Sequence, residues 1–231
     1  MPIIQDEEFG KITIRRSAQA TQVKVRVAPD GTLRASLPMR APIFLVKHLL
    51  RSSRNELRQM LSKSKPGYHY EDGMQIGKSH TLIIRHHTGS NIDVSRHNRQ
   101  IIVELPVNHD INEARTVRKI REIVIPALRL EAKSYLPRRL LFLSQKYDLK
   151  YEKVRFSHAS GRWGSCSSSG TISLNIALMK LPFELIDYVI VHELSHTIHM
   201  NHGFEFWSLV AQADPNYKTH RRMLKSQNPS V

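Results

Sequence analysis

The sequence predicts an α+β protein in which a small, basic, β-rich N-terminal unit precedes a mainly helical C-terminal part. Three observations carry this prediction. Polar and apolar residues alternate with period two in several early segments, which is typical of strands. Apolar residues recur at helical spacing in the later segments, and the basic residues are concentrated in the earlier ones. We therefore predict one domain over residues 1–110 and a second over residues 111–231.

The composition is that of a folded globular protein. The chain has 231 residues with 40% hydrophobic and 24% charged residues, and its formal net charge is +15. A single cysteine, Cys166, excludes an internal disulfide framework. The first eight residues lack the basic and apolar regions of a signal peptide, and no apolar run approaches the roughly 20 residues of a membrane span. We expect a cytoplasmic protein with no membrane insertion.

The positive charge is concentrated in residues 11–65, which hold 13 Lys and Arg side chains and only Asp30 and Glu56 as acids. Such a segment can attract nucleic acid or another polyanion. The alternative is that these basic side chains form a surface that only keeps the protein soluble. No helix-turn-helix, zinc-finger or RNA-recognition signature accompanies the charge, so the charge alone identifies no partner.

In the N-terminal unit, turn residues 28–31 join two alternating segments into a predicted hairpin. Pro42 is expected to open a helix that runs to about residue 63. Two further strands are predicted at about 81–86 and 100–105.

The second part begins with a predicted helical region from Asn112 to about Tyr147, bent at its two prolines. Short strands are expected at 153–156 and 171–175. The intervening residues 157–170 are too rich in Gly and Ser for a helix or a strand. Two more helices are predicted, at about 183–199 and 203–213.

The strongest chemical signal is His192-Glu193-Leu194-Ser195-His196. Residues four apart share a helix face, so both imidazoles can bind one metal ion while Glu193 reaches a metal-bound water. With 13 histidines in the chain, chance would produce this pattern about 0.04 times. The surrounding residues are apolar, as in a helix buried on most sides. The alternative is a pair of hydrogen-bonded core histidines.

A catalytic zinc site usually has three protein ligands and one open position. The candidates for the third ligand are His202, Glu205 and His199. His199 lies on the same helix face as the pair but a turn further on, and one straight helix rarely surrounds an ion. His202 follows a point where the chain can turn back, and Glu205 would imitate zincins with a glutamate ligand from a following helix. We favour His202, then Glu205, then His199.

Four segments in the same order resemble the YgjP-like metallopeptidases, a family similar to the SprT and WLM zincins: Arg162-Trp163-Gly164-Ser165-Cys166, residues 171–175, residues 187–196 and residues 201–207. The resemblance implies a zincin-like catalytic domain built around the helix that carries the His-Glu-x-x-His motif. It also implies one Zn²⁺ per chain, held by His192, His196 and His202, with Glu193 as the general acid/base.

These residues predict a zinc metallopeptidase that acts on peptide or protein substrates. Zinc would lower the pKa of its bound water, and Glu193 would take the proton as the water attacks a carbonyl carbon. Two alternative functions use the same metal site. One is hydrolysis of a nucleotide or another phosphoanhydride, and the other is a protease that docks on nucleic acid through residues 11–65.

The loop before the metal motif has two interpretations. Arg162, Trp163 and Ser165 can contact the substrate, or the loop can be purely structural, with Cys166 as a buried filler. Aromatic residues after the third histidine are expected to pack the following helix onto the metal helix as core. They are Phe204, Phe206 and Trp207.

Overall fold

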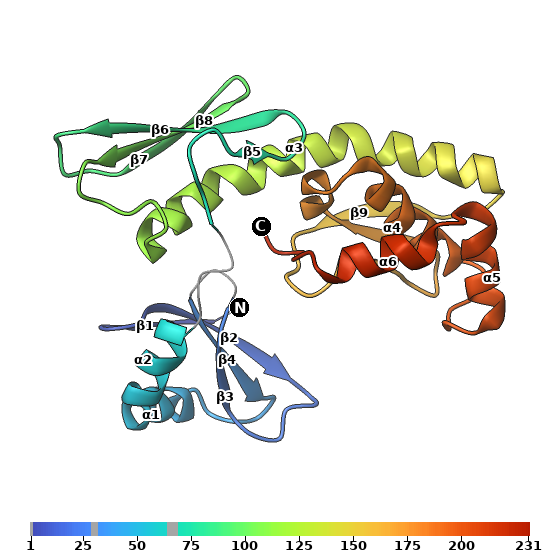
Figure 1. Ribbon diagram of the computed structural model, residues 1–231. Coiled ribbons are helices and arrows are strands. Elements are labelled where there is room, and N and C mark those ends of the chain that lie inside the picture. The colour runs from blue at the N-terminus through green and yellow to red at the C-terminus, as the bar shows by residue number, and fades with distance from the viewer. Residues whose placement is uncertain (1, 29–31, 64–68) are drawn as a thin grey trace. The chain divides into compact units, whose positions relative to one another are not determined.

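The computed structural model describes residues 2–28, 32–63 and 69–231. The chain forms two compact units: Met1–His69 with Asn112–Val117, and Tyr70–Ile111 with Arg118–Val231. The described residues form three small sheets and six α-helices (Figure 1), so the predicted mixed α+β class is confirmed. The predicted domain boundaries, 1–110 and 111–231, stay a prediction.

The first unit is a four-stranded sheet with two helices. Its strands are β1 (Ile3–Asp6), β2 (Gly10–Ser17), β3 (Lys24–Val27) and β4 (Leu33–Pro38), in the order β1-β2-β4-β3. The predicted hairpin forms, because β3 pairs with β4 antiparallel. Turn residues 29–31 lie outside the described residues.

Residues 42–63 form two helices, α1 (Phe44–Ser52) and α2 (Arg54–Lys63), and the single predicted helix is wrong. The break is at Ser53, whose backbone angles (φ −112°, ψ 26°) lie outside the helical region. The hydroxyl of the preceding residue, Ser52, donates to the Leu49 carbonyl in the last turn of the first helix.

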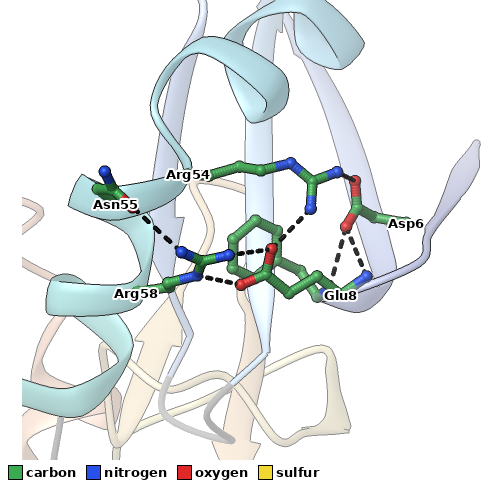
Figure 2. Close-up of polar contacts among 6 residues, drawn as sticks. Asp6, Glu8, Arg54, Asn55 and Arg58 are labelled. Atoms are coloured by element: carbon green, nitrogen blue, oxygen red, sulfur yellow. Dashed lines mark hydrogen bonds and ion pairs between the residues drawn. The ribbon is translucent and has the colours of Figure 1, made fainter.

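Ion pairs connect α2 with the turn between β1 and β2 (Figure 2). Arg54 donates to Glu8 Oε2 at 2.6 Å, and Arg58 donates to both oxygens of Glu8. The two arginines lower the pKa of the Glu8 carboxyl below its usual range, chiefly through the hydrogen bond from Arg58. Part of the positive charge of residues 11–65 is therefore neutralised within its own unit, and docking of nucleic acid on this segment stays a prediction.

The second unit begins with a sheet of β5 (Gln75–Ile76), β6 (His80–His87), β7 (Asp93–His97) and β8 (Gln100–Pro106), in the order β5-β6-β8-β7. The predicted strands at 81–86 and 100–105 are confirmed. They pair parallel, because the unpredicted strand β7 lies between them in sequence and pairs antiparallel with β8.

Helix α3 (Ala114–Tyr147) runs on through both Pro126 and Pro137. Apolar residues on one of its faces are fully buried, and a charged contact fixes it to a later helix, α4 (Phe183–Ser195). Arg139 donates two hydrogen bonds to the carboxylate of Asp187, at 2.7 and 2.5 Å. Two parallel bonds of this kind fix orientation as well as distance.

The remaining elements surround the metal motif. Strands β9 (Lys153–Ser157), β10 (Gly164–Cys166) and β11 (Thr171–Asn175) form a sheet in the order β10-β11-β9, which confirms the two predicted strands. The 3₁₀ helix η1 (Ile176–Lys180), α4, α5 (Phe204–Ala213) and α6 (Tyr217–Lys225) follow. Within the described residues, no helix combines the length and apolar character that a membrane span requires.

Three expectations for this region are wrong. Residues 157–170 are not all loop, because Gly164–Cys166 pairs with β11 despite its small residues. The helix predicted to reach residue 199 ends at Ser195, where the chain turns toward the following histidines. Helix α6 was not predicted. It is nine residues long, has no buried residue and is strongly polar, so few apolar residues mark it in the sequence.

Candidate metal centre

His192 and His196 lie at the C-terminal end of α4. This helix buries nine of its thirteen residues, so the apolar sequence around the motif is explained by burial on most sides. His196 caps the helix with αR backbone angles (φ −68°, ψ −16°), which keeps it on the same face as His192. The two rings meet edge to face with centroids 5.0 Å apart.

His202 reaches the pair from the segment between α4 and α5. One ring nitrogen from each of His192, His196 and His202 lies within 4.8 Å of the others, and the Nε2 atoms of His192 and His202 are 3.1 Å apart. The segment is held by Trp207, whose indole N–H donates to the His202 carbonyl at 3.1 Å and whose ring stacks on the His202 imidazole. Trp207 in turn stacks on Tyr217 of α6.

The side chains of His199 and Glu205, the other two candidates for the third ligand, do not join the group of three histidines. His199 contributes its backbone carbonyl, 3.0 Å from Nδ1 of His196. A carbonyl can only accept, so Nδ1 of His196 carries the proton and Nε2 is left with its lone pair for a metal. Glu205 is exposed in the first turn of α5 and does not join the group of three histidines.

The three histidines fit a divalent metal ion such as zinc. Ligand nitrogens about 2.0–2.1 Å from a tetrahedral ion lie about 3.3 Å apart, close to the 3.1 Å between the two Nε2 atoms. Burial lowers the pKa of His192 to about 3 and also lowers the pKa of His196, which keeps both rings in the neutral form that binds metals. Nδ1 of His192 is buried and has no hydrogen-bond partner among the described residues.

Glu193 lies on the buried side of α4, beside strand β10. Its side chain is 6% exposed, and burial raises the pKa of its carboxyl to about 8, against the opposing effect of the positive charge on Arg162. A Cβ atom added to Gly164 would lie 2.6 Å from Oε1 and 2.7 Å from Cγ of Glu193. Only glycine therefore lets β10 approach this carboxylate so closely.

The side chain of Asn175 holds the loop that precedes Gly164. Its amide nitrogen lies within hydrogen-bond distance of the carbonyl oxygens of Ala159, Arg162 and Pro229, at 2.7, 2.9 and 3.0 Å. Its backbone N–H donates to the carbonyl of Trp163. Asn175 is fully buried, so this polar anchor is protected from water.

Of the residues predicted to bind substrate, Arg162 and Trp163 lie in this anchored loop and Ser165 lies in β10. Arg162 is exposed, whereas Trp163 and Ser165 are half-buried, and their contact with a substrate stays a prediction. Cys166 is also half-buried rather than a core residue, and burial together with the charge of Glu193 raises the pKa of its thiol. A raised pKa disfavours the reactive thiolate.

The three aromatic residues after His202 do not share one role. Phe206 is fully buried and stacks on the His196 ring, with centroids 4.5 Å apart, as expected of core. Phe204 is 83% exposed, so its predicted core role is wrong. The two residues lie two positions apart on α5, and a helix turns neighbours at that spacing to different sides.

Gly164 and Asn175 lie in two of the segments that resemble the family, but no local pattern in the sequence indicates the role of either residue. Their roles depend on contacts with Glu193 and with the loop, which lie far away in sequence. The signal that could have found them is a glycine in a segment predicted to approach the metal helix.

We compared the chain with models of known protein families. The model of the YgjP-like metallopeptidase domain matches residues 21–227. The chain belongs to the YgjP-like metallopeptidase family. This YgjP-like protein is therefore a metallopeptidase, whose substrates are peptides or proteins, and the family expectation from the sequence is confirmed.

Solved structures similar to this YgjP-like chain include two metallopeptidase zymogens. Abylysin of Pyrococcus abyssi is 26% identical, with a TM-score of 0.36, over 41% of this chain and 98% of its own. Jannalysin of Methanocaldococcus jannaschii is 18% identical, with a TM-score of 0.35, over 39% of this chain and 93% of its own. No curated protein matches the sequence.

Proposed function

We propose that this metallopeptidase is zinc-dependent, with His192, His196 and His202 as the metal ligands and Glu193 as the general base. The observation that carries the proposal is the convergence of three imidazole nitrogens within 4.8 Å, next in sequence to one buried carboxylate. Three neutral histidines are a ligand set of catalytic zinc sites, which keep a fourth position open.

Bound zinc supplies a Lewis acid that makes water a nucleophile near neutral pH. The protein's own groups would transfer the proton and orient the metal ligands. Glu193, in its ionised form, would accept a proton from the attacking water and return it to the leaving amine, and burial raises the pKa of its carboxyl to about 8, which makes the ionised form a stronger base. The carbonyl of His199 orients the ring of His196, and Trp207 orients the segment that carries His202.

The test is hydrolysis of a peptide library by zinc-loaded wild type and by the Glu193→Gln variant, with metal content measured for both. We expect the variant to keep its zinc and to lose at least about 100-fold in kcat, the usual contribution of a general base. Glu205→Gln is the matched control, because Glu205 is exposed and outside the histidine group. Wild-type turnover by Glu193→Gln would refute the assignment of the base.

The ligand set is tested by zinc content. We expect His202→Ala to lose bound zinc, whereas His199→Ala should keep it, because His199 acts through its backbone. Loss of zinc from His199→Ala alone would overturn the assignment. Nucleoside triphosphates in the same activity screen test the phosphoanhydride alternative.

A further inference from the structure

A cavity of about 410 Å³ opens in the second unit, away from the three histidines. It lies between β6, the β7–β8 turn, the middle of α3 and the start of α4. Its wall includes the exposed apolar side chains of Leu130 and Phe183, and the ring of Tyr135 lies 5.4 Å from that of Phe183. The volume is that of a small ligand pocket and is large enough for one big apolar side chain.

The rim of this cavity is basic. Arg96 at the end of β7 and Arg99 in the β7–β8 turn are exposed, and neither guanidinium group has a hydrogen bond or ion pair with any described residue. Lys78 lies over the Phe183 ring at 4.3 Å and donates to a backbone carbonyl, that of Leu181. Unpartnered guanidinium groups beside an apolar wall favour a carboxylate-bearing ligand, which an arginine fork can bind through two hydrogen bonds.

The acidic side chain in the lining is buried and hydrogen-bonded within its own chain, whereas Arg96 and Arg99 are exposed. Glu131 accepts hydrogen bonds from the N–H groups of Lys78 and Ser79, at 2.7 and 3.0 Å, and contacts His80 Nδ1 at 2.6 Å. Gly77, at φ +65°, makes the turn that wraps this carboxylate. The same contacts fix the floor of the cavity, since Glu131 and His80 are both buried.

We propose that this cavity is an exosite that binds an acidic segment of a polypeptide substrate, with one large apolar side chain against Leu130, Tyr135 and Phe183. The carboxylates flanking that side chain pair with Arg96 and Arg99. The inference goes beyond the hydrolytic chemistry proposed above, and it rests on family membership for the peptide nature of the ligand.

Helix α4 connects the exosite with the candidate metal centre. Phe183 and His192 lie nine residues apart on this helix, which separates them by roughly 14 Å along its axis. About four residues of extended peptide cover that distance. One substrate chain can therefore occupy both places, and the anchor residue would lie at least about four residues from the scissile bond.

The test is fluorescence anisotropy with a labelled peptide that carries one Phe between Asp and Glu residues. The protein is the zinc-loaded full chain with Glu193→Gln, so that the peptide stays intact. We expect Arg96→Ala/Arg99→Ala to weaken binding about tenfold. Phe183→Ala should weaken binding of this peptide but not of a version with Ser in place of Phe.

The matched control is Arg138→Ala/Lys153→Ala, which removes the same charge from exposed positions of the same unit that do not line the cavity. This control should change the affinity for the peptide less than about twofold, because an exposed charge outside the binding site contributes little to the binding energy. Equal loss in both double variants, or equal affinity of the Phe and Ser peptides, would overturn the exosite. Because the readout is binding, failure of the exosite leaves the hydrolytic assignment untouched.

Discussion

The contact between Gly164 and Glu193 explains why a glycine precedes the Ser-Cys pair of β10. The added Cβ of any other residue would overlap the carboxylate that we propose as the base. The effect is steric rather than conformational, because the backbone of Gly164 is that of an ordinary strand.

We predict that Gly164→Ala displaces Glu193 and lowers kcat by about 100-fold, comparable with the loss of a general base, while zinc content stays unchanged. Steady-state kinetics together with metal analysis measure both effects. Gly161→Ala is the matched control in the same loop, because a Cβ at that position meets no atom within 4 Å. If Gly164→Ala retained wild-type kcat, the packing argument would be wrong.

The buried carboxyl of Glu193 also predicts how the stability of the metal-free protein depends on pH. Its pKa is about 8 in the folded protein and about 4.5 without burial, so the unfolded state releases the proton first as pH rises. Folding stability due to this group is therefore present below about pH 4.5 and is lost progressively up to about pH 8.

We expect Glu193→Gln, which cannot ionise, to stabilise the metal-free protein more and more over that interval, by on the order of 4 kcal/mol at pH 8. Urea unfolding of chelator-treated wild type and variant at a series of pH values measures the difference. Glu205→Gln should show no such trend, because Glu205 is exposed. A stability difference that shrinks as pH rises would contradict the prediction.

At the scale of elements, strand β11 is hydrogen-bonded both to the loop before β10 and to the C-terminal residues, through the side chain of Asn175. Asn175, its last residue, contacts the carbonyls of Ala159 and Arg162 in the loop and that of Pro229 near the C-terminus. The residues after Pro229 are buried, and Arg121 and Lys180 donate to their carbonyls. One buried amide thus connects three segments that are distant in sequence.

We predict that Asn175→Ala lowers the free energy of unfolding by about 1–3 kcal/mol, because it leaves three partly buried carbonyls without their donor. Chemical denaturation measures the loss, and hydrogen exchange should become faster at residues 159–163. Ser168→Ala, an exposed change in the turn between β10 and β11, should have almost no effect. Unchanged exchange in the loop would show that the amide does not hold it.

At the scale of the whole molecule, the proposed metal ligands all belong to the second unit. A ligand that binds only the folded state stabilises that state by an amount set by its concentration relative to Kd. Metal should therefore stabilise the second unit, and the first unit should respond only to the extent that the two units unfold together.

We expect zinc at about 100 times its Kd to add about 2.7 kcal/mol and to raise the Tm of the responding transition by about 5–10 °C. Differential scanning calorimetry of chelator-treated protein, with and without zinc, measures the shift. His202→Ala should lose it and His199→Ala should keep it. A shift of equal size in His202→Ala would show that zinc binds elsewhere.

The sequence by itself determined what depends on residues close together in the chain. The hairpin of β3 and β4 follows from local alternation, and the spacing of His192 and His196 follows from the helical repeat, so both could be predicted without coordinates. The mixed fold class and the family were also predictable. Helix ends were less so, because the end of α4 at Ser195 and the non-helical backbone of Ser53 have no counterpart in the apolar period.

Only the tertiary structure decided what depends on distant segments meeting. The parallel pairing of β6 with β8, the approach of His202 to His192 and the fit of Gly164 against Glu193 all join residues that no local pattern relates. The basic cavity between α3, α4 and the β7–β8 turn belongs to the same class. Close packing has no sequence period, so these contacts become visible only when the chain is folded.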